Sequence, residues 1–244
     1  MAQAANLRWL REAMEMARKL LDTGRLIVPV ILLLLSACQS SPSPVLSKEC
    51  APPCWRGIQP GRTPFQDAVD KVKKFQDYDP KGAGIGKSWK ILDSYVGFKL
   101  EGGENILIGA INDVVELIIF GNPKGITFQK SVEELGTPEY VGRSLMLGQG
   151  LPILPASDAM HTYLFIVSPS QGVVYGADMY NPWTGLDTNL APNAAIIDLR
   201  FFDNRIFDKL LSSGLLVYSN ERFSREELYP WKGYGDIREL YPDP

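Results

Sequence analysis

Two of the three cysteines, Cys50 and Cys54, stand close together with three residues between them. Two thiols at this spacing can form a local disulfide in an oxidising compartment. A zinc site would need further thiol or imidazole ligands, and the chain offers only one more cysteine and one histidine, His161. Redox motifs more typically have two intervening residues. The spacing therefore predicts a structural disulfide and no metal site.

Nucleophilic catalysis has little support in the sequence. Any serine triad would have to use His161, yet the chain has no Gly-x-Ser-x-Gly turn. The acidic residues show no spacing that singles out an acid–base pair, among them Asp178, Asp187, Asp198 and Asp203. We therefore expect no enzyme and no cofactor.

The run from Gly82 to Ser88 imitates a phosphate-binding loop. However, the position of the motif's first glycine holds Lys81, and a charged helical segment precedes the run instead of a buried strand. We interpret residues 79–87 as a glycine-rich linker and expect no nucleotide. The formal net charge of -3 and the pI of about 5.3 also argue against a nucleic-acid partner, because phosphates are neutralised by basic surfaces.

The N-terminal segment has the pattern of a secretory signal. Basic residues precede an uninterrupted apolar run from Leu26 to Leu35, and small residues then lead into Cys38. A secretory signal has this order of a positive region, a short apolar region and a cleavage-type site. A membrane-spanning helix needs about 20 apolar residues. This run is half as long and contains Pro29, so we expect a signal peptide at residues 1–37.

Leu35, Ser36, Ala37 and Cys38 resemble the bacterial lipobox. This resemblance implies that the Cys38 thiol receives a diacylglycerol, that acyl chains such as palmitate anchor the protein, and that cleavage occurs just before Cys38. An ordinary signal peptide with a cysteine at its cleavage site is the alternative. We interpret residues 38–49, which are rich in proline and serine, as a polar tether. The expected location is the extracytoplasmic face of the cell membrane or the outer membrane.

Beyond the tether, two segments repeat the order of a helix followed by strands. Apolar residues recur at helical spacing from Phe65 to Phe75 and again from Phe128 to Leu135. Strand-like runs follow each helix, at residues 95–100, 106–110 and 114–120 and then at residues 163–167, 173–179 and 196–202. Turn residues between these runs favour antiparallel meanders.

We therefore expect an α+β fold of two tandem units, each a helix followed by an antiparallel β-meander, with a single α+β domain as the alternative. The 244-residue sequence is 45% hydrophobic, which is enough for one good core or two small ones. The expected divisions after the tether are a first unit at 50–122, a second unit at 123–204, and a C-terminal helix and aromatic tail at 205–244 that acts as a latch.

The second helix carries a further resemblance. A Gly-x-Thr pattern precedes the helix at Gly125 and Thr127, and a Leu-Gly-x-Pro pattern ends it at Leu135, Gly136 and Pro138. These two ends resemble the SmpA/OmlA-type lipoprotein domain, the family of the small barrel-assembly lipoprotein. Folds related to that family include the tandem-repeat β-lactamase-inhibitory protein. The resemblance implies a helix packed on an antiparallel sheet. Physically, threonine can cap a helix N-terminus and glycine can end a helix in a left-handed conformation.

Two aromatic segments are candidates for partner binding. Tyr180 and Trp183 lie in a loop between two predicted strands, where recognition residues are often found. The C-terminal tail carries Tyr229, Trp231 and further tyrosines. For both segments the alternative is aromatic packing across the sheet. We expect a membrane-anchored, noncatalytic protein-binding or scaffold module whose partner is another envelope protein; the alternative is a cell-envelope hydrolase or inhibitor-like protein with a dispersed site.

Overall fold

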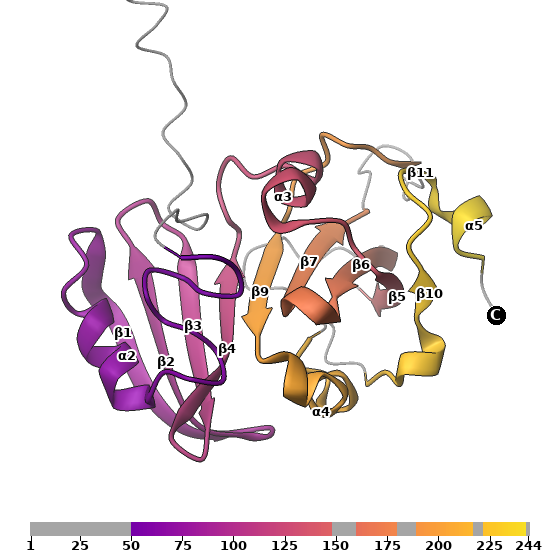
Figure 1. Cartoon of the computed structure of the whole chain (residues 1–244). Coiled ribbons are helices and arrows are strands. Elements are labelled where there is room, and N and C mark those ends of the chain that lie inside the picture. The colour runs from indigo at the N-terminus through magenta and orange to yellow at the C-terminus, as the bar shows by residue number, and fades with distance from the viewer. Residues whose placement is uncertain (1–49, 148–159, 180–188, 217–221, 243–244) are drawn as a thin grey trace, which may run out of the picture. The chain divides into compact units, whose positions relative to one another are not determined.

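The computed structural model describes residues 50–147, 160–179, 189–216 and 222–242 (Figure 1). The chain divides into two compact units, Met1–Pro42 and Ser43–Pro244, and all described residues lie in the second. Within these described ranges no helix has the length and apolar character needed to cross a membrane.

Nine strands form one antiparallel sheet in the order β1-β2-β3-β4-β9-β7-β6-β5-β10. Their bounds are β1 (Tyr78–Trp89), β2 (Leu92–Leu100), β3 (Asn105–Ile111), β4 (Val114–Gly121), β5 (Tyr140–Leu147), β6 (Met160–Ser168), β7 (Val173–Asp178), β9 (Asp198–Phe202) and β10 (Tyr229–Pro230). A separate two-stranded sheet contains β8 (Asn189–Leu190) and β11 (Gly235–Asp236). The predicted α+β combination of helices with antiparallel strands is confirmed, and the structure joins these strands in one large sheet.

The pairing of β4 with β9 joins the two halves of the sheet. Leu117 to Gly121 lie antiparallel to Phe202 to Asp198. On one side of this pair β3, β2 and β1 follow in order, and on the other side lie β7, β6 and β5. The rings of Phe120 and Phe201 are 5.3 Å apart, so aromatic packing spans the junction.

The described α-helices are short: α2 (Phe65–Val72), α3 (Phe128–Leu135), α4 (Phe207–Ser213) and α5 (Ile237–Leu240). The first two lie where helical spacing predicts them. Thr127 caps α3 by accepting a hydrogen bond from the Lys130 backbone N–H at 3.3 Å, and Gly136 follows the last residue with a φ of 92°. The Thr127 cap agrees with the sequence pattern, whereas Gly136 ends the helix with a positive φ but a ψ of 169°, outside the left-handed helical conformation.

Helices cover both faces of the sheet. The apolar residues of α2 and α3 belong to one core cluster, which includes Leu164 and Ile166 of β6. Those of α4 belong to a second cluster, which includes Phe165 and Val167 of the same strand. Because successive side chains of a strand point to opposite faces, the two clusters lie on opposite sides of the sheet. Figure 1 shows α2 and the segment before it crossing in front of the first half.

The prediction of a linker at residues 79–87 is wrong, because these residues belong to β1. In the ladder with β2, Ile85 lies opposite Val96 and Gly86 lies opposite Tyr95. A Cβ atom at Gly86 would come within 2.1 Å of the Tyr95 ring. At this position glycine makes room for a cross-strand aromatic ring and does not signal a flexible connection.

Trp55 anchors the irregular segment that precedes α2. Its side chain is fully buried, and its ring centroid lies 5.4 Å from that of Phe75 and 5.2 Å from that of Phe120. Arg56 lies over the same indole at 5.2 Å and forms a two-bonded pair with Asp77 at 2.6 and 2.7 Å. These contacts fix residues 50–64 on the face of the sheet that α2 and α3 cover.

Replacing Trp55 by alanine should therefore destabilise the whole fold. We expect Trp55→Ala to lower the free energy of unfolding by about 3–5 kcal/mol, since a large buried aromatic side chain leaves a cavity. Urea unfolding followed by circular dichroism measures the change. Trp89→Ala, at a half-buried tryptophan of the β1–β2 hairpin, is the matched control and should cost less than half as much. Equal losses in the two variants would contradict the anchoring role.

Candidate functional site

A cavity of about 370 Å³ opens where three segments that are distant in sequence meet. They are the segment before α2, the turn between β6 and β7, and the segment between β9 and α4. The lining residues are Pro52, Pro53, Gln59, Pro60, Gly61, Arg62, Ser170, Gln171, Gly172, Phe202, Asp203, Asn204 and Arg205. Clefts formed by converging loops on a rigid sheet are common places for binding sites. We therefore take this cavity as the candidate functional site.

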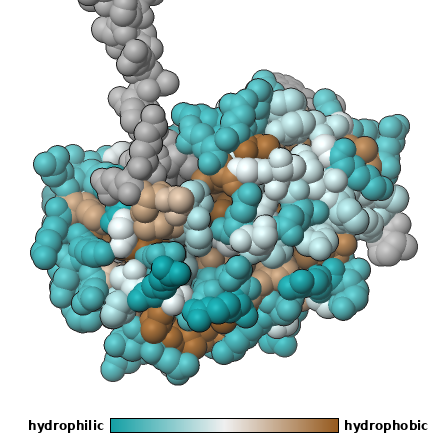
Figure 2. Space-filling view, in the orientation of Figure 1, coloured by the Kyte–Doolittle hydropathy of each residue, from teal (hydrophilic) through white to brown (hydrophobic). Residues whose placement is uncertain are grey.

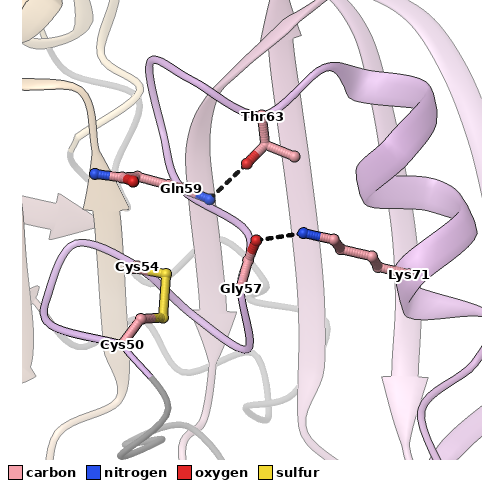
Figure 3. Close-up of a disulfide and its surroundings, with 6 residues drawn as sticks. All are labelled: Cys50, Cys54, Gly57, Gln59, Thr63 and Lys71. Carbon is pink, nitrogen blue, oxygen red and sulfur yellow. Dashed lines mark hydrogen bonds between the residues drawn. A yellow bond between two sulfur atoms is a disulfide. The ribbon is translucent and has the colours of Figure 1, made fainter.

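The first wall of the cavity is the segment that carries the two cysteines (Figure 3). Cys50 and Cys54 form a disulfide pair with a Cα–Cα distance of 5.6 Å, so the predicted pair lies at disulfide distance. The Gln59 backbone N–H donates to the Thr63 hydroxyl at 2.8 Å. Lys71 of α2 donates to the Gly57 carbonyl at 2.6 Å, which holds the segment against the helix.

Two glycines allow the three segments to approach closely. A Cβ atom at Gly61 would lie 2.1 Å from a carboxyl oxygen of Asp203, and one at Gly172 would lie 2.2 Å from the Phe202 carbonyl oxygen. Both glycines also have positive φ angles, 76° and 65°, which other residues rarely adopt. Any larger residue at either position would push the walls of the cavity apart.

A pair of carboxyl groups lies beside the cavity. Glu116 is the extra residue of a β-bulge, since Val115 and Leu117 of β4 lie opposite the consecutive residues Ala110 and Gly109 of β3. Its side chain is only 9% exposed, and within the described part of the chain its Oε2 atom has no hydrogen-bond partner. The bulge thus takes a glutamate out of the alternating pattern and leaves its carboxyl group close enough to Asp203 to feel the charge of that residue.

Arg205 neutralises the second carboxyl group of the pair. Its Nε atom donates to Asp203 Oδ2 at 2.7 Å, and its backbone N–H donates to Oδ1 at 3.0 Å. Its guanidinium also donates to the Gly61 carbonyl at 3.1 Å, so one arginine joins two walls of the cavity. The Asp203 backbone N–H in turn donates to the Glu116 carbonyl at 3.1 Å.

The two carboxyl groups have opposite pKa shifts. Burial and the nearby Asp203 charge raise the pKa of Glu116 from 4.5 to about 7. Burial also acts to raise the pKa of Asp203, but the hydrogen bonds and charge of Arg205 outweigh it and leave that pKa below its usual value. At neutral pH Asp203 is therefore ionised, while a large share of Glu116 retains its proton.

The cavity is suited to recognising polar groups. Arg62, Ser170, Asn204 and the Arg205 guanidinium are exposed at its rim, and Gln59 adds an amide. These side chains can donate hydrogen bonds to carbonyl or carboxylate oxygens of a bound polypeptide. No group of three or more acidic, histidine or cysteine side chains that could hold a metal ion occurs in the described ranges.

Several residues singled out in the sequence lie outside the described residues. These are the lipidation candidate Cys38 and the aromatic candidates Tyr180 and Trp183. His161 belongs to β6, but its side chain is not described. Asp198 is buried in β9, where it accepts hydrogen bonds from Tyr163 at 2.9 Å and from Arg200 at 2.7 Å. It therefore forms part of a buried polar cluster and not of the cavity.

The aromatic tail packs on the fold, as the alternative interpretation of that segment proposed. Trp231 stacks on Phe128 of α3 at 5.9 Å and on Tyr241 at 6.3 Å. Tyr241 is fully buried, and its hydroxyl accepts from the Lys232 backbone N–H at 2.9 Å. These rings are therefore occupied by internal contacts.

The sequence did not reveal the residues that form the cavity. Asp203 was one of several acidic residues without a distinguishing context, and Arg205, Gln59 and Ser170 carried no signal. Glu116 did carry one, because it interrupts the apolar run of β4 from Val114 to Phe120. A charged residue within a buried strand usually has a specific partner.

No protein-family model, curated protein sequence or solved structure matches the chain. The site is therefore interpreted from its own geometry.

The raised pKa of Glu116 predicts how stability depends on pH. Between pH 4.5 and about 7 the folded state binds more protons than the unfolded state, so the free energy of unfolding should fall as pH rises through this window. We expect Glu116→Gln to remove this fall and to stabilise the protein at pH 8 by about 1–2 kcal/mol, allowing for solvent screening. Glu101→Gln, at an exposed glutamate, is the control and should leave the pH profile unchanged. Identical profiles for wild type and Glu116→Gln would contradict the assignment.

Proposed function

We propose that the chain is a lipoprotein, anchored through Cys38 to the extracytoplasmic face of a cell membrane or outer membrane, whose folded part is a noncatalytic protein-binding or scaffold module. The observation that carries the proposal is the division of the chain between Pro42 and Ser43, inside the expected tether at 38–49. Cys38 thus belongs to a different unit from the sheet. The proposed lipid would therefore be attached to the chain outside the unit that contains the sheet and its cavity.

The disulfide pair supports an oxidising compartment. Cys50 and Cys54 lie just after the tether and at the first described residues of the fold. Disulfides persist in secreted and envelope proteins and are rare in the cytosol. The pairing is therefore consistent with export of the folded part.

The order of the strands supports a tandem duplication. A helix precedes each four-stranded half: α2 before β1 to β4, and α3 before β5, β6, β7 and β9. The last strands of the two halves, β4 and β9, pair antiparallel at the centre of the sheet. Two copies of one unit related by a local two-fold axis would give this order. The tail would then act as a latch on the second unit, where β10 pairs with β5.

The contacts of the carboxyl pair favour a structural role over catalysis. A hydrolase could use two carboxyl groups with separated pKa values as acid and base. Here both oxygens of Asp203 already accept hydrogen bonds from Arg205, and Glu116 is buried behind it at a bulge. The pair therefore joins the walls of a recognition surface. A cell-envelope hydrolase or an inhibitor-like protein remains the alternative function.

Cys38→Ser should release the protein from membranes without unfolding it, because the lipid is the proposed anchor. The measurements are fractionation of cells and the intact mass of the membrane-bound protein, which should begin at a diacylglyceryl cysteine. The double variant Cys50→Ser, Cys54→Ser is the matched control, because it removes the other two cysteines with their disulfide but keeps the anchor, and it should stay in the membrane fraction. A Cys38→Ser protein that remains membrane-bound would exclude the lipid anchor.

The binding role is tested at the rim of the cavity. A photoreactive residue placed at Arg62 should yield one discrete crosslinked protein in intact cells, because this exposed side chain borders the cavity. The same residue placed at Lys232, which is exposed on the tail, should not yield that product. Crosslinks that are absent at position 62, or the same at both positions, would count against a binding surface at the cavity.

A further inference from the structure

The two edges of the large sheet differ in how they are protected. At one edge lies β10, a strand of two residues that ends in Pro230, which has no N–H to offer. At the other edge lies β1, a strand of 12 residues that pairs only with β2 among the described strands. An open edge of this length carries a row of backbone donors and acceptors that another strand can pair with.

One face of β1 carries little side-chain bulk of its own, although the Tyr95 ring of β2 lies over Gly86. Glycine occupies the alternate positions 82, 84 and 86, and a Cβ atom at Gly82 or Gly84 would meet nothing within 4 Å in the described part of the chain. Alternating glycines in a strand allow a second backbone to approach closely. On the other face Ile85 is 63% exposed, and it is the exposed large hydrophobic residue of the described ranges.

A groove of about 180 Å³ runs beside Ile85, between β1 and α2. Its walls include Val69 and Val72 of α2 and Val96 of β2, all of which belong to the core. The groove is therefore a surface opening of the core at the edge of the sheet. Its volume suits one aliphatic side chain from a strand placed next to β1.

Lysine side chains lie along this edge. Lys81 and Lys87 of β1 and Lys73 of α2 are exposed. Of the nearby acidic groups, Asp79 accepts from the Lys81 backbone N–H at 2.8 Å, and Asp70 lies 3.7 Å from Lys73. A second copy of β1 paired antiparallel about Gly84 would place Lys81 opposite Lys87. The charge pattern thus favours an acidic partner strand over self-pairing.

We infer that β1 binds an extended segment of a partner protein by strand addition, with an aliphatic side chain in the groove beside Ile85 and acidic side chains facing the lysines. This inference rests on the proposed binding function and names the chemistry of the partner. Backbone hydrogen bonds provide the affinity, while the groove and the lysines select the sequence.

The test uses the full chain and a fluorescent peptide, Glu-Thr-Val-Thr-Val-Thr-Glu, with fluorescence anisotropy as the readout. A peptide with the same side chains but with N-methyl groups on alternate amides cannot form the ladder and should bind at least about tenfold more weakly. Hydrogen exchange should show new protection at residues 82–87 when the unmodified peptide is bound. Equal binding of the two peptides, or no new protection, would overturn strand addition.

Two variants test the selecting residues. Ile85→Lys should weaken binding about tenfold, because it places a charge at the groove, and its exposed position should leave the circular dichroism unchanged. Lys87→Glu should weaken binding by a similar factor, whereas Lys232→Glu makes the same charge change far along the chain and should not. Unchanged binding of Ile85→Lys would overturn the assignment of the groove.

Other occupants of the edge give distinct results. A dimer of the wild-type chain in sedimentation that Ile85→Lys dissociates would identify a second copy. Protection, in the free chain, of those amides of residues 82–87 that do not donate to β2 would identify one of the chain's own segments. Either result overturns the proposal of a partner strand. Because peptide binding does not need Cys38, loss of the anchor in Cys38→Ser tests the proposed function separately.

Discussion

The antiparallel pairing of β4 with β9 is the constraint on which the rest of the structure depends. It places the bulge residue Glu116 next to the end of β9, so that Asp203 can reach it, and it brings Gly61 within reach of Arg205. The turn between β6 and β7 reaches the same place, because the Phe202 backbone N–H donates to the Gly172 carbonyl at 2.9 Å. The cavity exists because these segments converge beside one ladder.

The bulge shows how a local irregularity serves the site. In a regular strand, position 116 would have to fit into the alternation between two apolar faces, where an ionised glutamate is costly. The extra residue lets Val115 and Leu117 keep their faces while Glu116 turns toward Asp203. The raised pKa is the physical consequence, because a partly buried carboxyl group beside an ionised one retains its proton.

Periodicity in the sequence predicted the helices α2 and α3, the strands β2, β3, β4, β6, β7 and β9, and the antiparallel class, because each of these elements has one apolar face or an apolar run. It failed at β1, where the reason for Gly86 lies in the Tyr95 ring of another strand. It also missed β5, because Gly142, Arg143 and Ser144 interrupt the apolar residues of that strand. The cavity was beyond prediction because its walls meet only through the β4–β9 ladder, although a glutamate in an apolar run was a visible clue.

The lysines at β1 have two physical explanations: protection of an open edge, and selection of an acidic partner strand. Lysine, proline and irregular register protect an open edge from unwanted pairing, and β1 has Lys81, Pro80 and a register shift in its first half. Protection of the edge alone would favour a polar residue in the regular second half of β1. Instead, that half carries Ile85, which is 63% exposed beside the groove that opens to the core. The irregular first half limits pairing to a short stretch, and the apolar residue makes that stretch attractive. Under the proposed strand addition, this combination would exclude long flat strands and admit a short, matching one.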